Sequence, residues 1–298
     1  MAEKSGAEKA FTLPSPDLSD VKYGPEERNV LDLWKAASDK PTPLVVCIHG
    51  GGFKGGNKNT YMQEKAAILV NLCLEAGISV AAINYRLSGQ AIAPAAMLDG
   101  ARAVQFLRSK AAEWNLDPER FAASGGSAGG GISLWLGFHD DLADPEATDP
   151  VKRESTRLSS MGVVATQSSY DLLFIREMFP GNEAWEHPAL LQFYGIKREE
   201  IDTPHARRLY YEASSINYVS AGDPPVFMFY PQPNVPLAPD AGPNVAIHHP
   251  KFGFVLKEKL EALGIECIVR CADDYEGDTR EKYYREMLEF FQRHFGCG

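Results

Sequence analysis

The chain has 298 residues, enough for one large α/β domain, and its 44% hydrophobic and 23% charged residues are typical of a globular protein. Its 40 acidic and 30 basic side chains give a net charge of -10, and such a surface repels the phosphates of nucleic acids. Every uninterrupted apolar run falls well short of the roughly 20 residues needed to span a bilayer. We therefore expect neither a nucleic-acid partner nor a membrane span.

The N-terminal residues and the cysteines both bear on the cellular compartment. Residues 1–20 are polar and mixed in charge, without the apolar core of a secretory leader. The number of cysteines is odd, which does not suit a complete disulfide framework. We expect free thiols in a reducing cytoplasm. The five are Cys47, Cys73, Cys267, Cys271 and Cys297.

In chain order, a predicted N-terminal arm (residues 1–25) precedes one domain (residues 26–298) of alternating strands and helices. Short apolar runs predict buried strands, and apolar residues at steps of three and four predict helices. Such alternation indicates a mostly parallel central sheet with helices on both faces. The predicted strands are 44–49, 78–84, 121–124, 162–167, 225–230 and 265–271, and the predicted helices are 61–75, a long helix through 101–114, 129–136, 250–263 and 280–295.

Two stretches interrupt the alternation: residues 137–160 are acidic and polar, and residues 170–222 carry aromatic side chains among charges. Both are expected as cap insertions over the carboxyl edge of the sheet, where ligands bind in such folds. Residues 231–250, rich in Pro, Gly and Asn, are expected to form a long loop. The aromatic residues of the second insertion could line an acyl or aryl pocket, or they could form the core of the cap. They are Tyr170, Phe174, Phe179, Trp185, Phe193 and Tyr194.

The central motif follows the predicted strand 121–124. Gly125, Ser127 and Gly129 satisfy G-x-S-x-G, the nucleophile elbow in which a serine occupies a strained turn between a strand and a helix. Glycines are needed beside the serine because larger side chains would clash with adjacent backbone. The motif predicts that Ser127 is a nucleophile.

A second glycine-rich motif, His49-Gly50-Gly51-Gly52-Phe53, ends the first predicted strand. A glycine run at this place lets backbone N–H groups turn toward the oxyanion of a tetrahedral intermediate. We expect the amides of Gly51 and Gly52, together with that of Ala128, to form an oxyanion hole. The run is not a phosphate-binding loop, because Asn57 stands where that motif requires lysine.

With these motifs the chain resembles the α/β-hydrolase esterases of the hormone-sensitive-lipase and feruloyl-esterase-like type. The resemblance runs from about Leu44 to Leu136 and includes further matching residues. It implies the α/β-hydrolase fold and a serine esterase without a cofactor. Tyr85, Arg86 and Asp99 are interpreted as structural polar anchors. The further matches are Asn84-Tyr85-Arg86-Leu87, Pro94 with Asp99, and Leu116-Asp117-Pro118-Glu119-Arg120.

The last third of the chain departs from the family's pattern. The acid expected after strand 225–230 is replaced by Asn234, an amide that can orient an imidazolium but cannot stabilise its charge as a carboxylate does. The loop after strand 265–271 should carry the general-base histidine. That loop reads Ala272-Asp273-Asp274-Tyr275-Glu276-Gly277-Asp278 and has none.

His248 or His249, in the loop 231–250, could supply a relocated base, since triads are recognised by geometry rather than by chain order. Asp240, Asp273 or Asp274 could orient that base, and we take His248 with Asp274 as the leading pair. We expect no metal site, because the ligand spacing matches no known pattern.

The sequence thus favours hydrolysis of a small-molecule carboxylic ester through an acyl-enzyme on Ser127. The alternative, favoured by the missing histidine at the family's usual base position, is a catalytically impaired hydrolase fold that binds a small molecule or a partner. A homodimer is left open.

Overall fold

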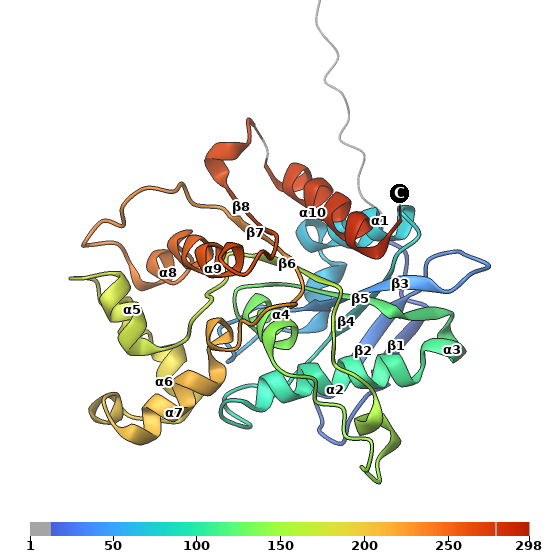
Figure 1. Ribbon diagram of the computed structural model, residues 1–298, viewed down its shortest axis with the longest axis horizontal. Helices are drawn as coiled ribbons and strands as arrows, with labels where there is room; N and C mark the ends of the chain where they lie inside the picture. The colour runs from blue at the N-terminus through green and yellow to red at the C-terminus, as the bar shows by residue number, and fades with distance from the viewer. Residues whose placement is uncertain (1–12, 278, 298) are drawn as a thin grey trace, which may run out of the picture.

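The structure is a computed structural model that describes residues 13–277 and 279–297 (Figure 1). Within these residues an eight-stranded sheet has the order β1-β2-β4-β3-β5-β6-β7-β8. The strands are β1 (Leu18–Lys22), β2 (Val30–Trp34), β3 (Thr42–Ile48), β4 (Ser79–Ile83), β5 (Leu116–Gly126), β6 (Ser160–Val164), β7 (Val226–Tyr230) and β8 (Cys267–Cys271).

Helices follow most of the strands, and none in the described part of the chain has the length and apolar character needed to cross a membrane. The α-helices are α1 (Glu64–Glu75), α2 (Ala95–Ser109), α3 (Ala111–Trp114), α4 (Ala128–Phe138), α5 (Leu172–Met178), α6 (Pro188–Tyr194), α7 (Pro204–Ala213), α8 (Pro243–Ala246), α9 (Lys251–Glu261) and α10 (Arg280–Phe295). Short 3-10 helices include η2 (Pro150–Arg153), η3 (Ala184–Glu186) and η6 (Ala272–Asp274).

Strands β3 to β8 pair in parallel, so the predicted mostly parallel sheet is confirmed. Because the strands run the same way, their carboxyl ends meet at one edge of the sheet. His49 follows β3 at this edge, and Ser127 follows β5. The two glycine-rich motifs are therefore neighbours in space although they lie far apart in the sequence.

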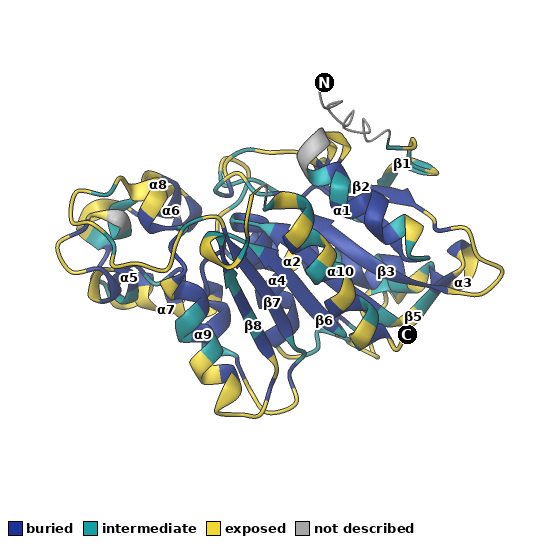
Figure 2. Cartoon of the chain, turned by 90° about the horizontal axis from the view of Figure 1, so that it is seen from above, coloured by how far each residue is buried: buried dark blue, intermediate teal, exposed yellow. Residues whose placement is uncertain are grey.

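The sheet is covered on both faces, as predicted. Alternate residues of β3 point to opposite sides: Val46 joins the apolar core under α2 and α4, and Val45 joins the core under α1 and α10. Figure 2 shows the central strands β3 and β4 buried between these helix layers. Full burial on both faces explains why the central strands read as continuous apolar runs in the sequence.

The predicted N-terminal arm differs from the structure. Residues 1–12 lie outside the described residues, and residues 18–22 form the edge strand β1, antiparallel to β2. Strand β2 was not predicted, because the buried Asp32 interrupts its apolar run. The carboxylate of Asp32 is paired with Lys58, whose Nζ lies 2.7 Å away, and accepts a 2.9 Å bond from the amide of Asp20. A buried charge needs such partners, and they come from distant parts of the chain.

The first predicted cap insertion, residues 137–160, lies at the opposite edge of the sheet from the one expected. Helix α4 runs back from the carboxyl edge, so the segment after it lies at the amino ends of the strands. There the amide of Ser159 donates to the carbonyl of Phe121 (2.7 Å), and Gln105 of α2 donates to the carbonyl of Glu154 (2.9 Å). This segment cannot cover Ser127.

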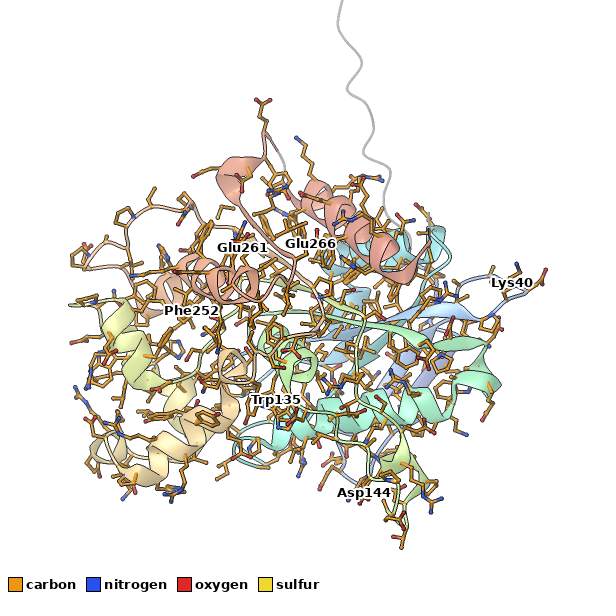
Figure 3. All side chains as sticks on the ribbon, in the orientation of Figure 1. Lys40, Trp135, Asp144, Phe252, Glu261 and Glu266 are labelled. Atoms are coloured by element: carbon orange, nitrogen blue, oxygen red, sulfur yellow. The ribbon has the colours of Figure 1, made fainter. Side chains whose placement is uncertain are left out.

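Residues 170–222, called the insert below, follow the carboxyl end of β6 and carry α5, α6 and α7. In both Figure 1 and Figure 2 these helices lie together at one side of the sheet, next to α8 and α9. Two residues labelled in Figure 3 join the insert to the rest of the fold. Trp135 of α4 donates to the carbonyl of Glu212 (2.9 Å), and Phe252 of α9 packs edge-on against Phe179 with ring centroids 5.7 Å apart.

Candidate active site

Ser127 occupies a sharp turn between β5 and α4. Its backbone has φ 50° and ψ -120°, a conformation that costs a non-glycine residue about 1–3 kcal/mol. Neighbouring backbone compensates, because the Ser127 amide donates to the carbonyl of Val164 (2.9 Å) and the hydroxyl of Thr166 donates to the carbonyl of Ser127 (2.8 Å). The turn presents the serine at the carboxyl edge of the sheet, half-buried at the start of a helix.

The glycines that flank Ser127 are required by close backbone contacts, as the sequence predicts. A Cβ atom on Gly129 would lie 2.0 Å from the carbonyl oxygen of Ile48. On Gly125 it would lie 2.5 Å from the carbonyl carbon of Gly129. Both distances are far below van der Waals contact, so the first turn of α4 can pack against the end of β3 only without side chains.

His248 lies within hydrogen-bond distance of Ser127. Its Nε2 lies 2.9 Å from Ser127 Oγ, and its Nδ1 lies 2.8 Å from the main-chain carbonyl oxygen of Asn244. A carbonyl can only accept a hydrogen bond, so in the neutral ring Nδ1 carries the proton and Nε2 presents a lone pair to the serine hydroxyl. This is the tautomer that a general base requires.

Burial sets the charge of this imidazole. Desolvation lowers the pKa of His248, the nearby His187 lowers it further, and the hydrogen bond to the Asn244 carbonyl acts in the opposite direction. The net effect is downward, so the ring is neutral at pH 7 and able to accept the proton of Ser127.

The glycine-rich loop after β3 lies beside the elbow: a Cβ on Gly50 would lie 3.6 Å from the Cβ of Ser127. Gly51 has φ +116°, which strongly favours glycine, and its carbonyl accepts bonds from the amides of Lys54 and Gly55 (both 3.1 Å). In the described part of the chain the amides of Gly51 and Gly52 donate to no protein acceptor.

The first amide of a helix likewise has no partner within its helix, and Ala128 holds this position in α4. Three expected oxyanion donors are thus available to a ligand, and their role stays a prediction.

The buried side chains of His49 and Tyr85 support this loop. The ring of His49 stacks on Tyr85 with centroids 4.4 Å apart, and the Tyr85 hydroxyl donates to the carbonyl of His49 (2.9 Å). Burial lowers the pKa of His49 to about 4, so the ring is neutral at pH 7. Arg28, between β1 and β2, donates to the carbonyls of Tyr85 (2.7 Å) and Gly56 (2.9 Å), which joins the end of this loop to the segment after β4.

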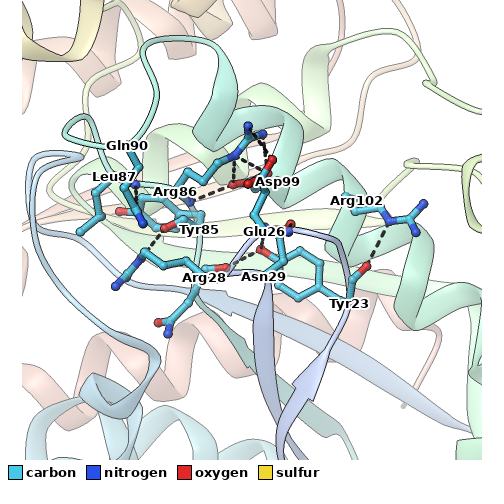
Figure 4. A network of polar contacts seen from close by, with 11 residues as sticks. Tyr23, Glu26, Arg28, Asn29, Tyr85, Arg86, Leu87, Gln90, Asp99 and Arg102 are labelled. Carbon is cyan, nitrogen blue, oxygen red and sulfur yellow. Dashed lines mark hydrogen bonds and ion pairs between the residues drawn. The ribbon is translucent and has the colours of Figure 1, made fainter.

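Figure 4 shows the adjoining network, in which Arg86 forms a bidentate pair with Asp99 (2.7 and 2.9 Å). The backbone amide of Arg86 also donates to Asp99, at 2.8 Å. These bonds join the segment after β4 to α2. Tyr85, Arg86 and Asp99 therefore make the contacts of structural anchors, as interpreted from the sequence.

The aromatic residues of the insert pack on one another and on aromatic residues of the rest of the fold. Phe193 stacks on Phe53 of the glycine-rich loop (centroids 4.0 Å apart), and Tyr170 meets Phe53 edge-on at 5.3 Å. Tyr170, Phe179, Phe193 and Tyr194 are buried, whereas Phe174 and Trp185 are partly exposed. The arrangement is that of a core which fastens the insert to the glycine-rich loop.

Comparison with known proteins places this site in a family. A model of the BD-FAE family matches residues 31–236, more than half of the chain, including both glycine-rich motifs. The chain belongs to the BD-FAE family. Esterase LipQ of Mycobacterium tuberculosis is 26% identical over 80% of this chain and 55% of its own length. Carboxylesterase NlhH of the same species is 28% identical over 53% of this chain and 49% of its own length. The BD-FAE chain thus spans about half the length of these curated relatives.

Solved structures agree on the fold. A carbohydrate esterase from gut microbiota, solved in truncated form, superposes with a TM-score of 0.73 at 20% identity, over 98% of this chain and all of that one. The propionate-bound esterase Est2 of Thermogutta terrifontis gives 0.66 at 18% identity, over 96% of both chains. The predicted α/β-hydrolase fold and the predicted esterase resemblance are confirmed.

The BD-FAE match ends at residue 236, before the histidine that meets Ser127. The structure also distinguishes the two histidines that the sequence offered as the general base. His249 is buried, donates from Nε2 to the carbonyl of Val235 (2.8 Å) and accepts the amide of Lys251 at Nδ1 (3.1 Å). Both of its nitrogens are occupied by backbone groups, so it is a structural residue of the loop.

The predicted partner of the base, Asp274, does not orient His248. Its carboxylate accepts the amide of Cys271 (2.7 Å) at the start of η6, and the nitrogen it was expected to meet is already bonded to Asn244. The other candidates for this role are exposed, and among the described residues none of them is hydrogen-bonded to His248: Asp273, Asp240 and Asn234.

Asn244 was not singled out in the sequence. Every residue has a main-chain carbonyl, so the side chain gives no signal that this one meets His248.

Proposed function

We propose that this BD-FAE protein is a serine esterase that hydrolyses carboxylic esters of small molecules. The observation that carries the proposal is the 2.9 Å contact between Ser127 Oγ and the unprotonated Nε2 of a neutral His248. A serine hydroxyl is a weak nucleophile at neutral pH unless a base within about 2.6–3.2 Å accepts its proton. The ester-hydrolase names of the curated relatives support the same reaction.

In the proposed reaction Ser127 Oγ attacks the acyl carbon while its proton moves to His248 Nε2. The negative charge that develops on the carbonyl oxygen is stabilised by the amides of Gly51, Gly52 and Ala128. Collapse of the tetrahedral intermediate breaks the ester bond, and His248 returns the proton to the departing alkoxide. Water, activated by the same imidazole, then hydrolyses the acyl-enzyme and releases the acid.

In this mechanism the carbonyl of Asn244 takes the place of the triad carboxylate. It holds the Nδ1 proton in place and so fixes the orientation and tautomer of the ring. As a neutral dipole it stabilises the imidazolium less than a carboxylate would. We therefore expect His248 to act as a base, and we expect a lower kcat than that of an esterase with a complete triad.

The alternative, an impaired hydrolase fold that only binds ligands, rested on the lack of a histidine at the family's usual base position. The contact between His248 and Ser127 supports the enzyme instead. A single experiment separates the two: incubation with a fluorophosphonate, followed by peptide mass spectrometry. We expect a stoichiometric adduct on Ser127, and no adduct in Ser127→Ala. Failure of the native protein to react under conditions that label a known serine esterase would overturn the proposed function.

We also propose that the protein works in a reducing compartment, the cytoplasm. In the described residues all five cysteines are free thiols, and four of them are buried. Burial raises the pKa of Cys73 to about 12 and that of Cys267 to about 12, which keeps these thiols protonated and unreactive.

A further inference from the structure

The loop that carries His248, residues 231–250 and called the base loop below, is mostly exposed up to Val245. Its last residues are buried, and Ala246 and Ile247 belong to the apolar core. Side chains of the insert contact the exposed part. Asn182 donates to the carbonyl of Ala241 (2.9 Å), and His187 Nε2 lies 3.1 Å from Asn244 Oδ1. The short helix α8 of this loop packs on η3 of the insert.

His187 makes two hydrogen bonds that together fix the tautomer of its neutral ring. Its Nδ1 accepts the backbone amide of Ala189 (3.2 Å) and so caps the N-terminus of α6. An atom that accepts an N–H bond carries no proton, so in the neutral ring the proton is on Nε2. Nε2 therefore donates to the side-chain oxygen of Asn244.

Asn244 is bonded on two sides. Its side chain accepts from His187 of the insert, and its carbonyl accepts from Nδ1 of His248. The chain of contacts thus runs from α6 through His187 and Asn244 to His248 and Ser127. The same end of α6 also lies beside the glycine-rich loop, since a Cβ on Gly52 would lie 3.4 Å from the Cβ of Ala189.

We propose that His187 is a positioning residue for the base: by donating to Asn244 it holds the carbonyl that orients His248. This inference rests on the proposed esterase function. It means that the insert takes part in setting the catalytic geometry, because the start of α6 contacts the base loop next to His248.

Two substitutions separate the two bonds of His187. In His187→Ser the hydroxyl can still cap α6 but cannot reach Asn244. In His187→Gln the side-chain amide can still donate to Asn244, whereas a good cap is lost. We expect His187→Ser to lower kcat for p-nitrophenyl acetate roughly fivefold to tenfold, the loss of one ordinary hydrogen bond, with KM within about twofold. His187→Gln should keep kcat within about threefold of the native value.

Asn244→Ala removes the other partner of this bond and should lower kcat to the same extent. The double variant with His187→Ser should show no further loss, because both changes break one interaction. The exposed His205→Ala, on α7 of the same insert, serves as the control and should leave kcat unchanged. Thermal unfolding of each variant shows whether the fold is intact.

A role for His187 in helix capping alone predicts the reverse pattern, with kcat retained in the serine variant and reduced in the glutamine variant. That result would overturn the proposal, and so would additive losses in the double variant. Failure of the native protein to react with a fluorophosphonate or to turn over p-nitrophenyl acetate would instead refute the proposed esterase function, so the two failures can be told apart.

Discussion

Ser127 and His248 lie within hydrogen-bond distance, but the chain holds them by different means. The elbow around Ser127 is fixed by backbone packed on backbone, with Gly129 so close to the end of β3 that no side chain fits. The base loop is exposed up to Val245, where hydrogen bonds from insert side chains hold it, and only its last residues beside His248 are buried. Ser127 is therefore placed by the sheet, whereas the placement of His248 depends in part on polar contacts with the insert.

The different ways in which Ser127 and His248 are held have a functional consequence. Backbone packing leaves no room for a side chain at Gly125 or Gly129, whereas a loop held by separate bonds can change its partners one at a time. A main-chain carbonyl can serve in place of an acid because the loop around it brings it to the imidazole. We expect the two regions to respond differently to mutation, and three predictions test this difference.

The largest effect is expected at the base. His248→Ala should lower kcat for p-nitrophenyl acetate by a factor on the order of 10³, the range that a general base contributes. Because Ser127 and His248 act as a unit, the double variant with Ser127→Ala should be no slower than Ser127→Ala alone. Turnover by His248→Ala within tenfold of the native rate would mean that another group accepts the proton.

The elbow should respond through stability. Gly129→Ala places a Cβ 2.0 Å from the carbonyl oxygen of Ile48, so backbone must shift, and we expect the free energy of unfolding to fall by about 3 kcal/mol. Gly126→Ala is the matched control, since its nearest contact would be 3.8 Å from the Val164 carbonyl; we expect a change within about 1 kcal/mol. Urea unfolding measures both. Equal stability of the two variants would refute the backbone-packing account.

The smallest effect is expected at Asp274, the residue that the sequence favoured as the partner of the base. Asp274→Asn keeps an oxygen to accept the amide of Cys271 and should leave kcat within about twofold of the native value. The kcat for p-nitrophenyl acetate is the measurement. A loss of tenfold or more, with an unchanged unfolding midpoint, would return Asp274 to the site and contradict the role given to Asn244.

The sequence predicted most of the fold because the buried parallel strands are short apolar runs and the helices have a clear apolar face. The helix 280–295 was predicted to the residue, and each of the six predicted strands is present with shifted ends. The missed strands β1 and β2 are at the antiparallel edge, where exposed positions in β1 and the buried Asp32 in β2 remove the apolar signal.

For the site, the sequence by itself identified the nucleophile elbow and the glycine-rich loop, because each needs glycines at fixed positions in one short segment. Only the tertiary structure distinguished His248 from its neighbour His249, since both are in a loop without periodic pattern. Only the tertiary structure shows that Nδ1 of His248 donates to the carbonyl of Asn244 and that His187 of the insert donates to the side chain of Asn244. Such contacts join residues distant in sequence, and one of the partners is a carbonyl that every residue possesses. Local pattern cannot encode them, and the packing of the insert against the base loop decides them.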